Sequence, residues 1–286
     1  MGGGLRLAAL FVPAQCWQRS VGTTGERGVA RSTFIALAAL AIGVPALVVA
    51  QDTPTYLPDG SLDMTQILPP APVKGDPRYE ADRRIFKATR HWLGTPRGDM
   101  ATRDVRTGGP AMAEAFSCSL GIKLDPAMAP KTMKLIAIGG ATANAQSRAS
   151  KDFFKRLRPY QIDKGKTCQA PGELAGSYDY PSGHTTWGWT WAIILANLAP
   201  DRATPILQRG RAYGESRVVC GVHNYSAIEA GRVTASATYA AELGQPEFQA
   251  DLAAARAELT ALRASPAAPK PEKCAAEANL VALHIL

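Results

Sequence analysis

The feature that most constrains the fold of this chain is its scarcity of alternating, strand-like sequence. Runs of Val, Ile and Thr with a period of two are rare, whereas alanine is abundant along the chain. Alanine has the highest helix propensity of the amino acids. With 286 residues, of which 46% are hydrophobic, the chain also has enough apolar material for one sizeable core. The sequence therefore predicts an all-α fold, built as a single-domain helical bundle.

The predicted domain covers residues 76–264. Asp76 followed by Pro77 predicts a helix start, because Asp is a favoured N-cap and Pro is favoured at the first helical position. An extended lead-in rich in Pro, Asp and Gly precedes it over residues 51–75, and a Pro- and Ala-rich tail follows over residues 265–286. The expected helices are 77–93, 99–105, 110–121, 129–156 with a break near Gly139-Gly140, 184–198, 201–214, 225–243 and 246–264.

Residues 1–50 are interpreted as a leader with a signal peptide. Arg27 and Arg31 precede an apolar stretch over residues 33–49, and Ala50 is a small residue at the end of a suitable cleavage site. The alternative is an uncleaved membrane anchor, but the apolar run is short and contains a proline. No later segment has the length of a membrane span. We therefore expect a periplasmic or secreted protein whose mature chain has no stable membrane insertion.

The cysteines support export. Outside the leader the chain has an even number of them, Cys118, Cys168, Cys220 and Cys274. An even number in an exported chain predicts one or two disulfides. Three pairings are possible, and the sequence does not choose among them.

Several classes of ligand are not expected. The cysteines and histidines form no zinc motif, and the acidic residues form no tight group that would hold two metal ions. We therefore expect no metal and no cofactor. The net charge of +8 is moderate and the basic residues are scattered, so nucleic acid is not an expected partner.

Three clusters of residues together satisfy the needs of phosphate-ester cleavage. That reaction needs fixed positive charge around the phosphoryl oxygens, a nucleophile, and an acid that protonates the leaving group. In the first cluster, Lys151 and Arg158 are seven residues apart, which would place both on one face of a helix that Pro159 ends. The alternative interpretation of this cluster is a solvated basic helix end.

The second cluster runs from Tyr180 to Thr185 and reads Tyr-Pro-Ser-Gly-His-Thr. Gly183 lets the backbone approach a ligand, and the free N–H groups at the start of the next helix favour an anion. Ser182 can donate a hydrogen bond, and His184 would lie beside the anion as an acid. The alternative is a capped helix start with an incidental histidine.

The third cluster contains Arg217 and His223. Arg217 adds a third cation, whose planar guanidinium suits phosphate oxygens. His223 is the candidate nucleophile, because a neutral imidazole can attack phosphorus and become a phosphohistidine. The alternative is a core histidine packed beside Val218 and Val222.

In combination, K-x6-R-P, P-S-G-H and S-R-x5-H resemble the tripartite signature of the type 2 phosphatidate phosphatase (PAP2) superfamily. Gly176-Ser177 ahead of the second cluster is similar to the version found in the bacterial class A nonspecific acid phosphatases. The resemblance runs from Pro77 to Leu243. It implies a helical bundle of the PAP2/vanadium haloperoxidase type that hydrolyses phosphate monoesters with broad specificity, an acidic optimum and a phosphohistidine intermediate.

The resemblance also implies roles for particular residues. His223 would be the nucleophile and His184 the general acid and base. The phosphate would be held by Lys151, Arg158, Ser182, Gly183 and Arg217. The implied ligands are small phosphate monoesters as substrates and inorganic phosphate or vanadate as inhibitors, and family members are often homo-oligomers.

The chain departs from the family pattern at Ala227. The family places an aspartate there, four residues after the nucleophile, to accept a hydrogen bond from the other ring nitrogen. In serine proteases the loss of the orienting aspartate costs about 10⁴ in turnover. We therefore predict an active but slow enzyme, in which Ala227→Asp raises turnover unless a group from elsewhere already orients His223. Glu229 is unsuited, because two residues along a helix turn it by about 200°.

The resemblance leaves other functions open. A vanadium haloperoxidase has a similar anion pocket but is generally a longer chain. A phosphotransferase would pass the phosphoryl group to an alcohol or nucleoside instead of water. Ala227 also raises the hypothesis of a weakly active or non-catalytic phosphate-binding protein. A membrane lipid phosphatase is disfavoured, because the chain after the leader has no spanning segment.

Aromatic residues flank the second cluster on both sides. Trp187, Trp189 and Trp191 follow His184 on different faces of the expected helix, so most of them should serve packing. Any one near the mouth of the pocket would contact an aromatic leaving group. Residues 178–180, Tyr-Asp-Tyr, precede the cluster on the loop into the pocket, where they are expected to shape substrate choice.

Overall fold

The computed structural model describes residues 54–58 and 60–286. The predicted leader over residues 1–50 lies outside them. The described part of the chain consists of helices and connecting loops without a strand, which confirms the all-α prediction. Among these helices, none has the length and apolar character needed to cross a bilayer.

The long helices lie close to the predicted ranges. α2 begins as predicted, since Asp76 Oδ1 accepts a hydrogen bond of 2.7 Å from the N–H of Arg78 and Pro77 takes the first helical position. The bounds are α2 (Pro77–Ala88), α3 (Pro96–Arg103), α4 (Gly109–Leu120), α5 (Pro130–Phe154), α7 (Gly183–Leu198), α8 (Ala203–Val219), α9 (Tyr225–Glu242) and α10 (Pro246–Ala264).

Several short elements were not predicted. The lead-in contains α1 (Met64–Ile67), and the tail contains α11 (Cys274–Ala282). The segment after α5 contains α6 (Pro159–Ile162) and a 3₁₀ turn over Pro171–Leu174. Two further 3₁₀ turns follow α2 (Thr89–Trp92) and precede α8 (Pro200–Arg202). Such short helices lack the long apolar periodicity that identifies a helix from sequence.

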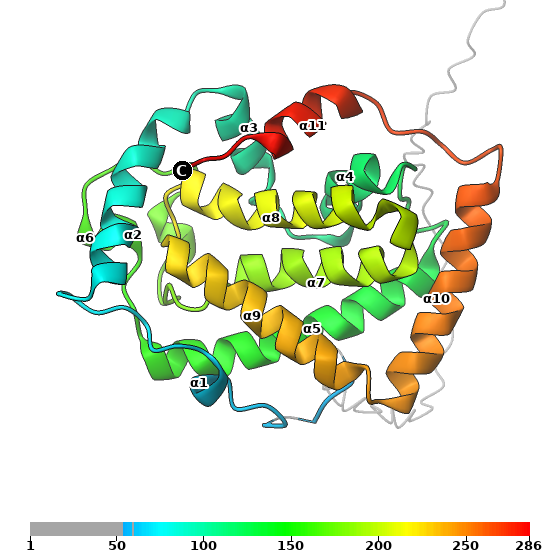
Figure 1. Cartoon of the computed structure of the whole chain (residues 1–286), viewed down its shortest axis with the longest axis horizontal. Helices are drawn as coiled ribbons and strands as arrows, with labels where there is room; N and C mark the ends of the chain where they lie inside the picture. Colours follow the sequence, from blue (N-terminus) through cyan, green and yellow to red (C-terminus); the bar gives the residue numbers. More distant parts are fainter. Residues whose placement is uncertain (1–53, 59) are drawn as a thin grey trace, which may run out of the picture. The chain divides into compact units, whose positions relative to one another are not determined.

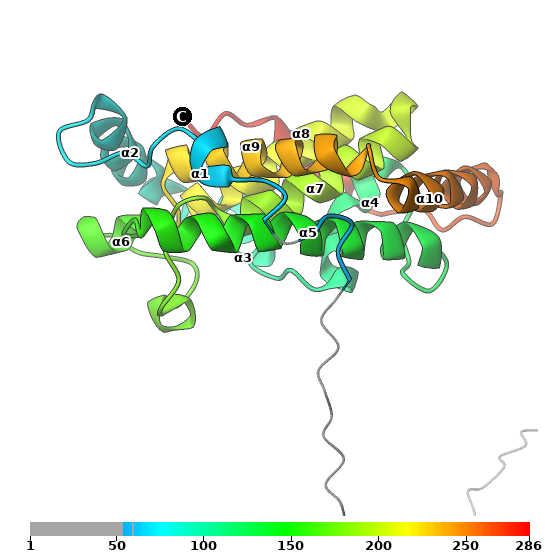
Figure 2. The same ribbon diagram turned by 90° about the horizontal axis from the view of Figure 1, so that it is seen from below.

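α7 is the central helix of the bundle. It packs against α5, α8 and α9, which surround it in Figure 1, and Figure 2 shows α5 running below these three helices. Trp191, Ile194 and Leu195 of α7 are fully buried. A helix that is apolar on nearly all sides belongs in a core. The last three residues of the second cluster, 183–185, form the first turn of this central helix.

α5 continues unbroken through Gly139-Gly140, so the predicted break there is wrong. These glycines instead allow α7 to approach closely. A Cβ on Gly140 would lie 1.7 Å from Cζ3 of Trp187, and one on Gly139 would lie 3.3 Å from Cδ1 of Ile194. The two positions therefore serve helix packing.

α5 also ends earlier than predicted, at Phe154. Lys155 adopts a left-handed conformation with φ of 45°, and its N–H bonds back to the carbonyl of Lys151. Arg158 therefore lies beyond the helix, as the N-cap of α6, with Pro159 at the first position of that helix. The prediction that Lys151 and Arg158 share one helix face is wrong.

Two disulfides select one of the three possible pairings. Cys118–Cys274 joins α4 to the start of α11, and Cys168–Cys220 joins the loop before α7 to the end of α8. The first disulfide attaches the C-terminal tail to the bundle, where Val281 is also buried.

Candidate active site

His223 lies in the short connection between α8 and α9. α8 extends past its predicted end at residue 214 and so carries Arg217 in its last turn. Gly221 then turns the chain with φ of 80°, and a Cβ there would lie 2.3 Å from Nη1 of Arg90. The N–H of His223 donates to the carbonyl of Arg217 at 3.3 Å, and the histidine is only 4% exposed.

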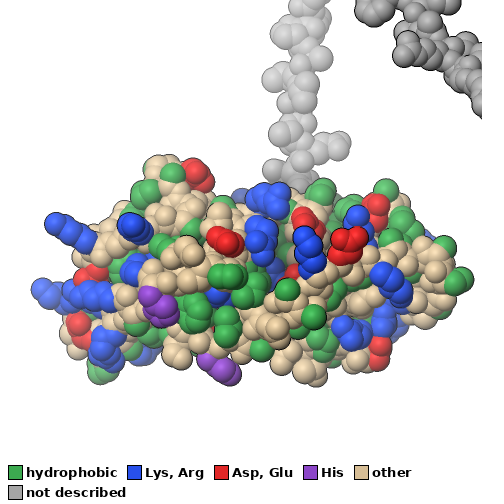
Figure 3. All heavy atoms as spheres, turned by 90° about the horizontal axis from the view of Figure 1, so that it is seen from above, with side chains coloured by type: hydrophobic (Ala, Val, Ile, Leu, Met, Phe, Trp, Pro, Cys, Tyr) green, Lys and Arg blue, Asp and Glu red, His purple; other side chains and the backbone are tan. Residues whose placement is uncertain are grey.

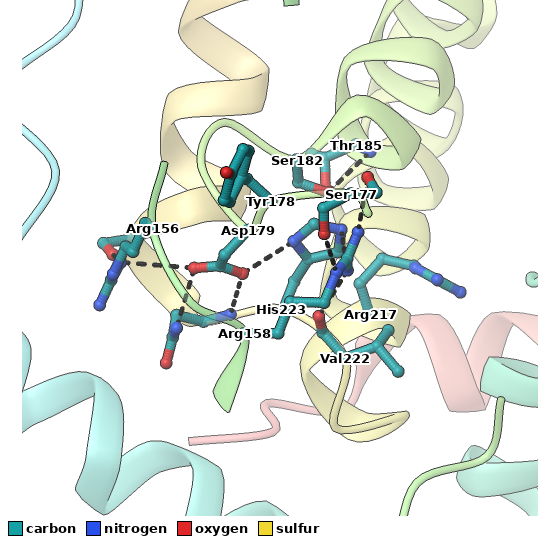
Figure 4. A network of polar contacts seen from close by, with 12 residues as sticks. Arg156, Arg158, Ser177, Tyr178, Asp179, Ser182, Thr185, Arg217, Val222 and His223 are labelled. Atoms are coloured by element: carbon teal, nitrogen blue, oxygen red, sulfur yellow. Dashed lines mark hydrogen bonds and ion pairs between the residues drawn. The ribbon is translucent and has the colours of Figure 1, made fainter. Parts of the chain in front are cut away.

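The imidazole of His223 lies between a carboxylate and a guanidinium (Figure 4). Nδ1 is 2.9 Å from Oδ1 of Asp179, and Nε2 is 3.1 Å from Nη1 of Arg158. A guanidinium only donates, so Nε2 must accept, and Nδ1 then carries the proton that it donates to Asp179. This tautomer leaves the lone pair of the ring on Nε2.

Asp179 is the functional candidate that sequence reasoning missed. We expected residues 178–180 to shape substrate choice, but the Asp179 side chain is fully buried against the nucleophile candidate. It also accepts hydrogen bonds from the backbone N–H of Asn224 at 3.1 Å and from its side-chain amide at 2.8 Å. The only sequence signal was its place in the loop before the second cluster.

A chain of buried charges holds this carboxylate in place. Nη1 of Arg156 lies 3.6 Å from Asp179, and Nη2 lies 2.7 Å from Asp82 on α2. Burial raises the pKa of Asp179, whereas Arg156 and the hydrogen bonds from Asn224 oppose that rise. Ala227 lies in an apolar cluster with Tyr180, and its carbonyl accepts from the N–H of Ser182 at 2.9 Å.

Lys151 and Arg158 reach the site from α5 and from the loop behind it. Nζ of Lys151 donates to the carbonyl of Tyr178 at 2.5 Å. Burial, followed by the positive charge of Arg158, lowers the pKa of Lys151 to about 7. Arg158 donates to the carbonyl and hydroxyl of Ser177 at 2.8 and 3.1 Å and to the carbonyl of Val222 at 2.8 Å. Both cations are thus fixed by neutral oxygens.

Arg217 is fully buried without a carboxylate partner among the described residues. Nη2 donates to Oε1 of Gln169 at 2.5 Å, whereas Nε and Nη1 have no partner in that part of the chain. By contrast, the buried Arg209 is paired with Asp104 at 2.6 Å. Burial lowers the pKa of Arg217 to about 10. Buried charges are normally paired, so these donors fit a site for an oxyanion.

The first residues of α7 complete the hollow. Oγ of Ser182, the N-cap, accepts from the N–H of Thr185 at 3.3 Å, which leaves the proton of its hydroxyl group for another acceptor. Gly183 opens the helix next to α5, where a Cβ would lie 3.9 Å from Cε of Lys151. A larger side chain at Gly183 would therefore extend toward the lysine.

His184 is partly buried and stacks on Tyr213, with ring centroids 6.0 Å apart. Its Nε2 is 2.9 Å from the carbonyl of Val105, so Nε2 carries a proton and Nδ1 is left free in the neutral ring. Burial lowers the pKa of His184 well below its ordinary value, and the charges of Arg217 and His223 lower it further. Without a bound anion, this environment therefore favours the neutral form of His184.

The structure brings the seven predicted site residues together. Burial lowers the pKa of His223, and the positive charges of Arg158, Lys151 and Arg217 lower it further. The N-terminus of α7 supplies the remaining three residues. In the described part of the chain, no group of His, Cys, Asp and Glu residues is arranged to hold a metal ion. On the face shown in Figure 3, basic side chains are scattered among acidic and apolar ones.

Comparisons with known proteins identify the family of this chain. Residues 133–246 match the model of the PAP2 superfamily. An acid phosphatase of Zymomonas mobilis is 36% identical to this chain over 212 residues, which cover 73% of this chain and 80% of that protein. A non-specific acid phosphatase of Salmonella typhimurium is 34% identical over 72% of this chain and 84% of that protein. A non-specific acid phosphatase of Providencia stuartii is 32% identical over 71% of this chain and 83% of that protein.

Proposed function

Because this chain belongs to the non-specific acid phosphatases of the PAP2 superfamily and hydrolyses phosphate monoesters, we propose that the reaction proceeds through a phosphohistidine on His223. The observation that carries the proposal is the environment of Nε2. This atom holds the lone pair of the ring and faces Arg158 at 3.1 Å, while Arg217 offers two unpartnered donors nearby. A phosphoryl group held by these cations would bring phosphorus within reach of Nε2.

In the first step Nε2 of His223 attacks phosphorus and the bond to the ester oxygen breaks. The electron pair of that bond goes to the ester oxygen, which takes a proton from protonated His184. The bound dianion raises the pKa of His184 and so favours its protonated form. The phosphorylated ring keeps its proton on Nδ1, and the carboxylate of Asp179 at 2.9 Å stabilises the positive charge.

In the second step His184 takes a proton from water, and the water oxygen attacks phosphorus. The phosphorus–nitrogen bond breaks, the electron pair returns to Nε2, and inorganic phosphate is formed. Rapid quenching with alkali followed by mass spectrometry would test this path, because the phosphorus–nitrogen bond of phosphohistidine survives alkali but is hydrolysed by acid. A phosphoryl group should be found on His223. The contact between Asp179 and His223 supports catalysis over the alternative raised by Ala227, a non-catalytic phosphate-binding protein.

The acid role of His184 predicts a dependence on the leaving group. His184→Ala is expected to lower kcat/KM for an alkyl phosphate about 10²- to 10⁴-fold, the usual range for loss of general acid catalysis. The loss should be much smaller for p-nitrophenyl phosphate, whose leaving group needs little protonation. Steady-state kinetics with both esters measure the two effects. Equal losses for the two esters would contradict the role.

The lowered pKa of Lys151 predicts how anion binding depends on pH. The ammonium group is charged below its pKa of about 7 and loses its charge as the pH rises through 7. Competitive inhibition by inorganic phosphate should therefore weaken about tenfold between pH 6 and 8 relative to a Lys151→Arg variant, which stays charged. The inhibition constants of both proteins across this range measure the effect. A constant ratio would refute it.

We propose that the reaction needs no metal ion, because three cationic side chains would supply the positive charge that a metal otherwise provides. Activity toward p-nitrophenyl phosphate should be unchanged after treatment with EDTA and dialysis. Loss of activity that a divalent cation restores would contradict this proposal.

We also propose that residues 1–50 direct export and are removed. The support is the pair of disulfides, which persist in oxidising compartments. N-terminal sequencing of the exported protein is expected to begin at Gln51. Recovery of the full-length chain from the membrane would favour an anchor instead.

A further inference from the structure

A hollow opens beside Gly183 and His184, the first two residues of α7. It has a volume of about 340 Å³ and is lined by Thr107, Asn144, Gly183, His184 and Trp187. None of these residues except the histidine is ionisable. The hollow therefore touches the proposed general acid but offers no fixed charge of its own.

Trp187 follows His184 by three residues on α7, so both side chains lie on one face of the helix. Its indole is fixed on several sides. Nε1 donates to the carbonyl of Thr107 at 3.2 Å, and the ring packs over Gly140, where even a Cβ would overlap it. The ring also meets Trp191 edge to face at 6.1 Å. The indole is thus a rigid wall of the hollow.

The other two tryptophans on α7 serve packing. Trp191 is fully buried in the main core. Trp189 donates from Nε1 to the hydroxyl of Ser236 at 3.0 Å and lies under the guanidinium of Arg232. Of the three, Trp187 lines the hollow.

We propose that this hollow is the leaving-group subsite, and that Trp187 makes the enzyme prefer phosphate esters whose alcohol carries an uncharged aromatic ring. The proposal rests on the proposed role of His184. The ester oxygen must reach His184 to be protonated, so the carbon atoms bonded to that oxygen extend into the space next to this residue. There an aromatic ring would meet the indole, and contact between aromatic rings gives attraction beyond that of equal apolar area.

Two esters that differ only in aromaticity give a sharp test. The alcohols 2-phenylethanol and 2-cyclohexylethanol have the same linker and nearly the same acidity, so protonation by His184 is matched. The wild-type enzyme should favour 2-phenylethyl phosphate by about two- to tenfold in kcat/KM. Trp187→Leu should abolish this preference, and Trp187→Phe should keep most of it.

Two controls separate the subsite from folding and from the chemical mechanism. Trp189→Leu, on the same helix but outside the hollow, should keep the preference. The inhibition constant of inorganic phosphate should stay within about twofold in Trp187→Leu, because phosphate alone does not reach the indole; this shows that the variant is folded.

Equal kcat/KM values for the two esters in the wild type, or an unchanged ratio in Trp187→Leu, would overturn the proposal. A failure of the proposed chemistry has a different signature. The absence of phosphorylated His223 after alkaline quenching would refute the intermediate, whereas the ratio of the two esters does not depend on the identity of the nucleophile.

Discussion

Replacement of His223 by alanine is expected to lower kcat about 10⁶-fold, the size of effect seen when the nucleophile of subtilisin is removed. The physical reason is that no other side chain of the described chain would offer a lone pair at the position of Nε2, 3.1 Å from Arg158. Steady-state hydrolysis of p-nitrophenyl phosphate measures the loss.

The matched control for this variant is anion binding. Lys151 and Arg217 remain in His223→Ala, so inorganic phosphate should still bind and inhibit any residual activity, and binding is measured directly by calorimetry. An enzyme that keeps more than about a hundredth of its turnover without the ring would contradict the assignment of the nucleophile.

The second large effect is expected for Asp179→Asn, which should lower kcat about 10³- to 10⁴-fold. An asparagine can turn its amide toward Nδ1 and favour the tautomer that carries the proton on Nε2. That proton would occupy the lone pair needed for attack and would also face the guanidinium of Arg158. The value of KM should change far less than kcat, because Asp179 does not face the anion.

If Asp179 had only a structural role, its replacement by asparagine would not change which ring nitrogen of His223 carries the proton. The nitrogen chemical shifts of His223 therefore provide a separate readout. In the wild type they should report a proton on Nδ1, and in Asp179→Asn a proton on Nε2. Unchanged shifts together with full activity would show that Asp179 does not orient the ring. Asp179→Glu should retain part of the activity if the carboxylate is what matters.

The contact between Asp179 and His223 changes the result expected for Ala227→Asp. Because Asp179 already accepts the hydrogen bond from Nδ1 of His223, a second carboxylate would be redundant. It would also enter an apolar cluster that contains Met64 and Leu68. We therefore expect unchanged or lower turnover in this variant. Increased turnover would mean that Asp179 orients the ring poorly.

Much of the fold and the site followed from local patterns. The long helices were predictable because capping residues and apolar periodicity are local signals, as at Asp76 and Pro77. The convergence of the seven candidate site residues was predictable because three short motifs carry them. The contact of Asp179 with His223 was not predictable, since it spans 44 residues and the motif pointed to position 227 instead.

The other features that the sequence did not predict also have physical causes. The end of α5 at Phe154 depends on a left-handed lysine, a conformation that few non-glycine residues adopt. Gly139 and Gly140 suggested a helix break from sequence. Their actual reason, the close approach of α7, is visible only in three dimensions. The disulfide pairing likewise depends on which helix ends meet in space.

The position of Asp179, five residues before His184, couples the two halves of the catalytic cycle. The group proposed to orient the nucleophile and the group proposed to protonate the leaving alcohol belong to one continuous stretch of backbone, whose later part is the start of α7. Any insertion or deletion between residues 179 and 184 would displace both at once. In this enzyme the length of that stretch is therefore under tighter constraint than the identity of the residue at 227.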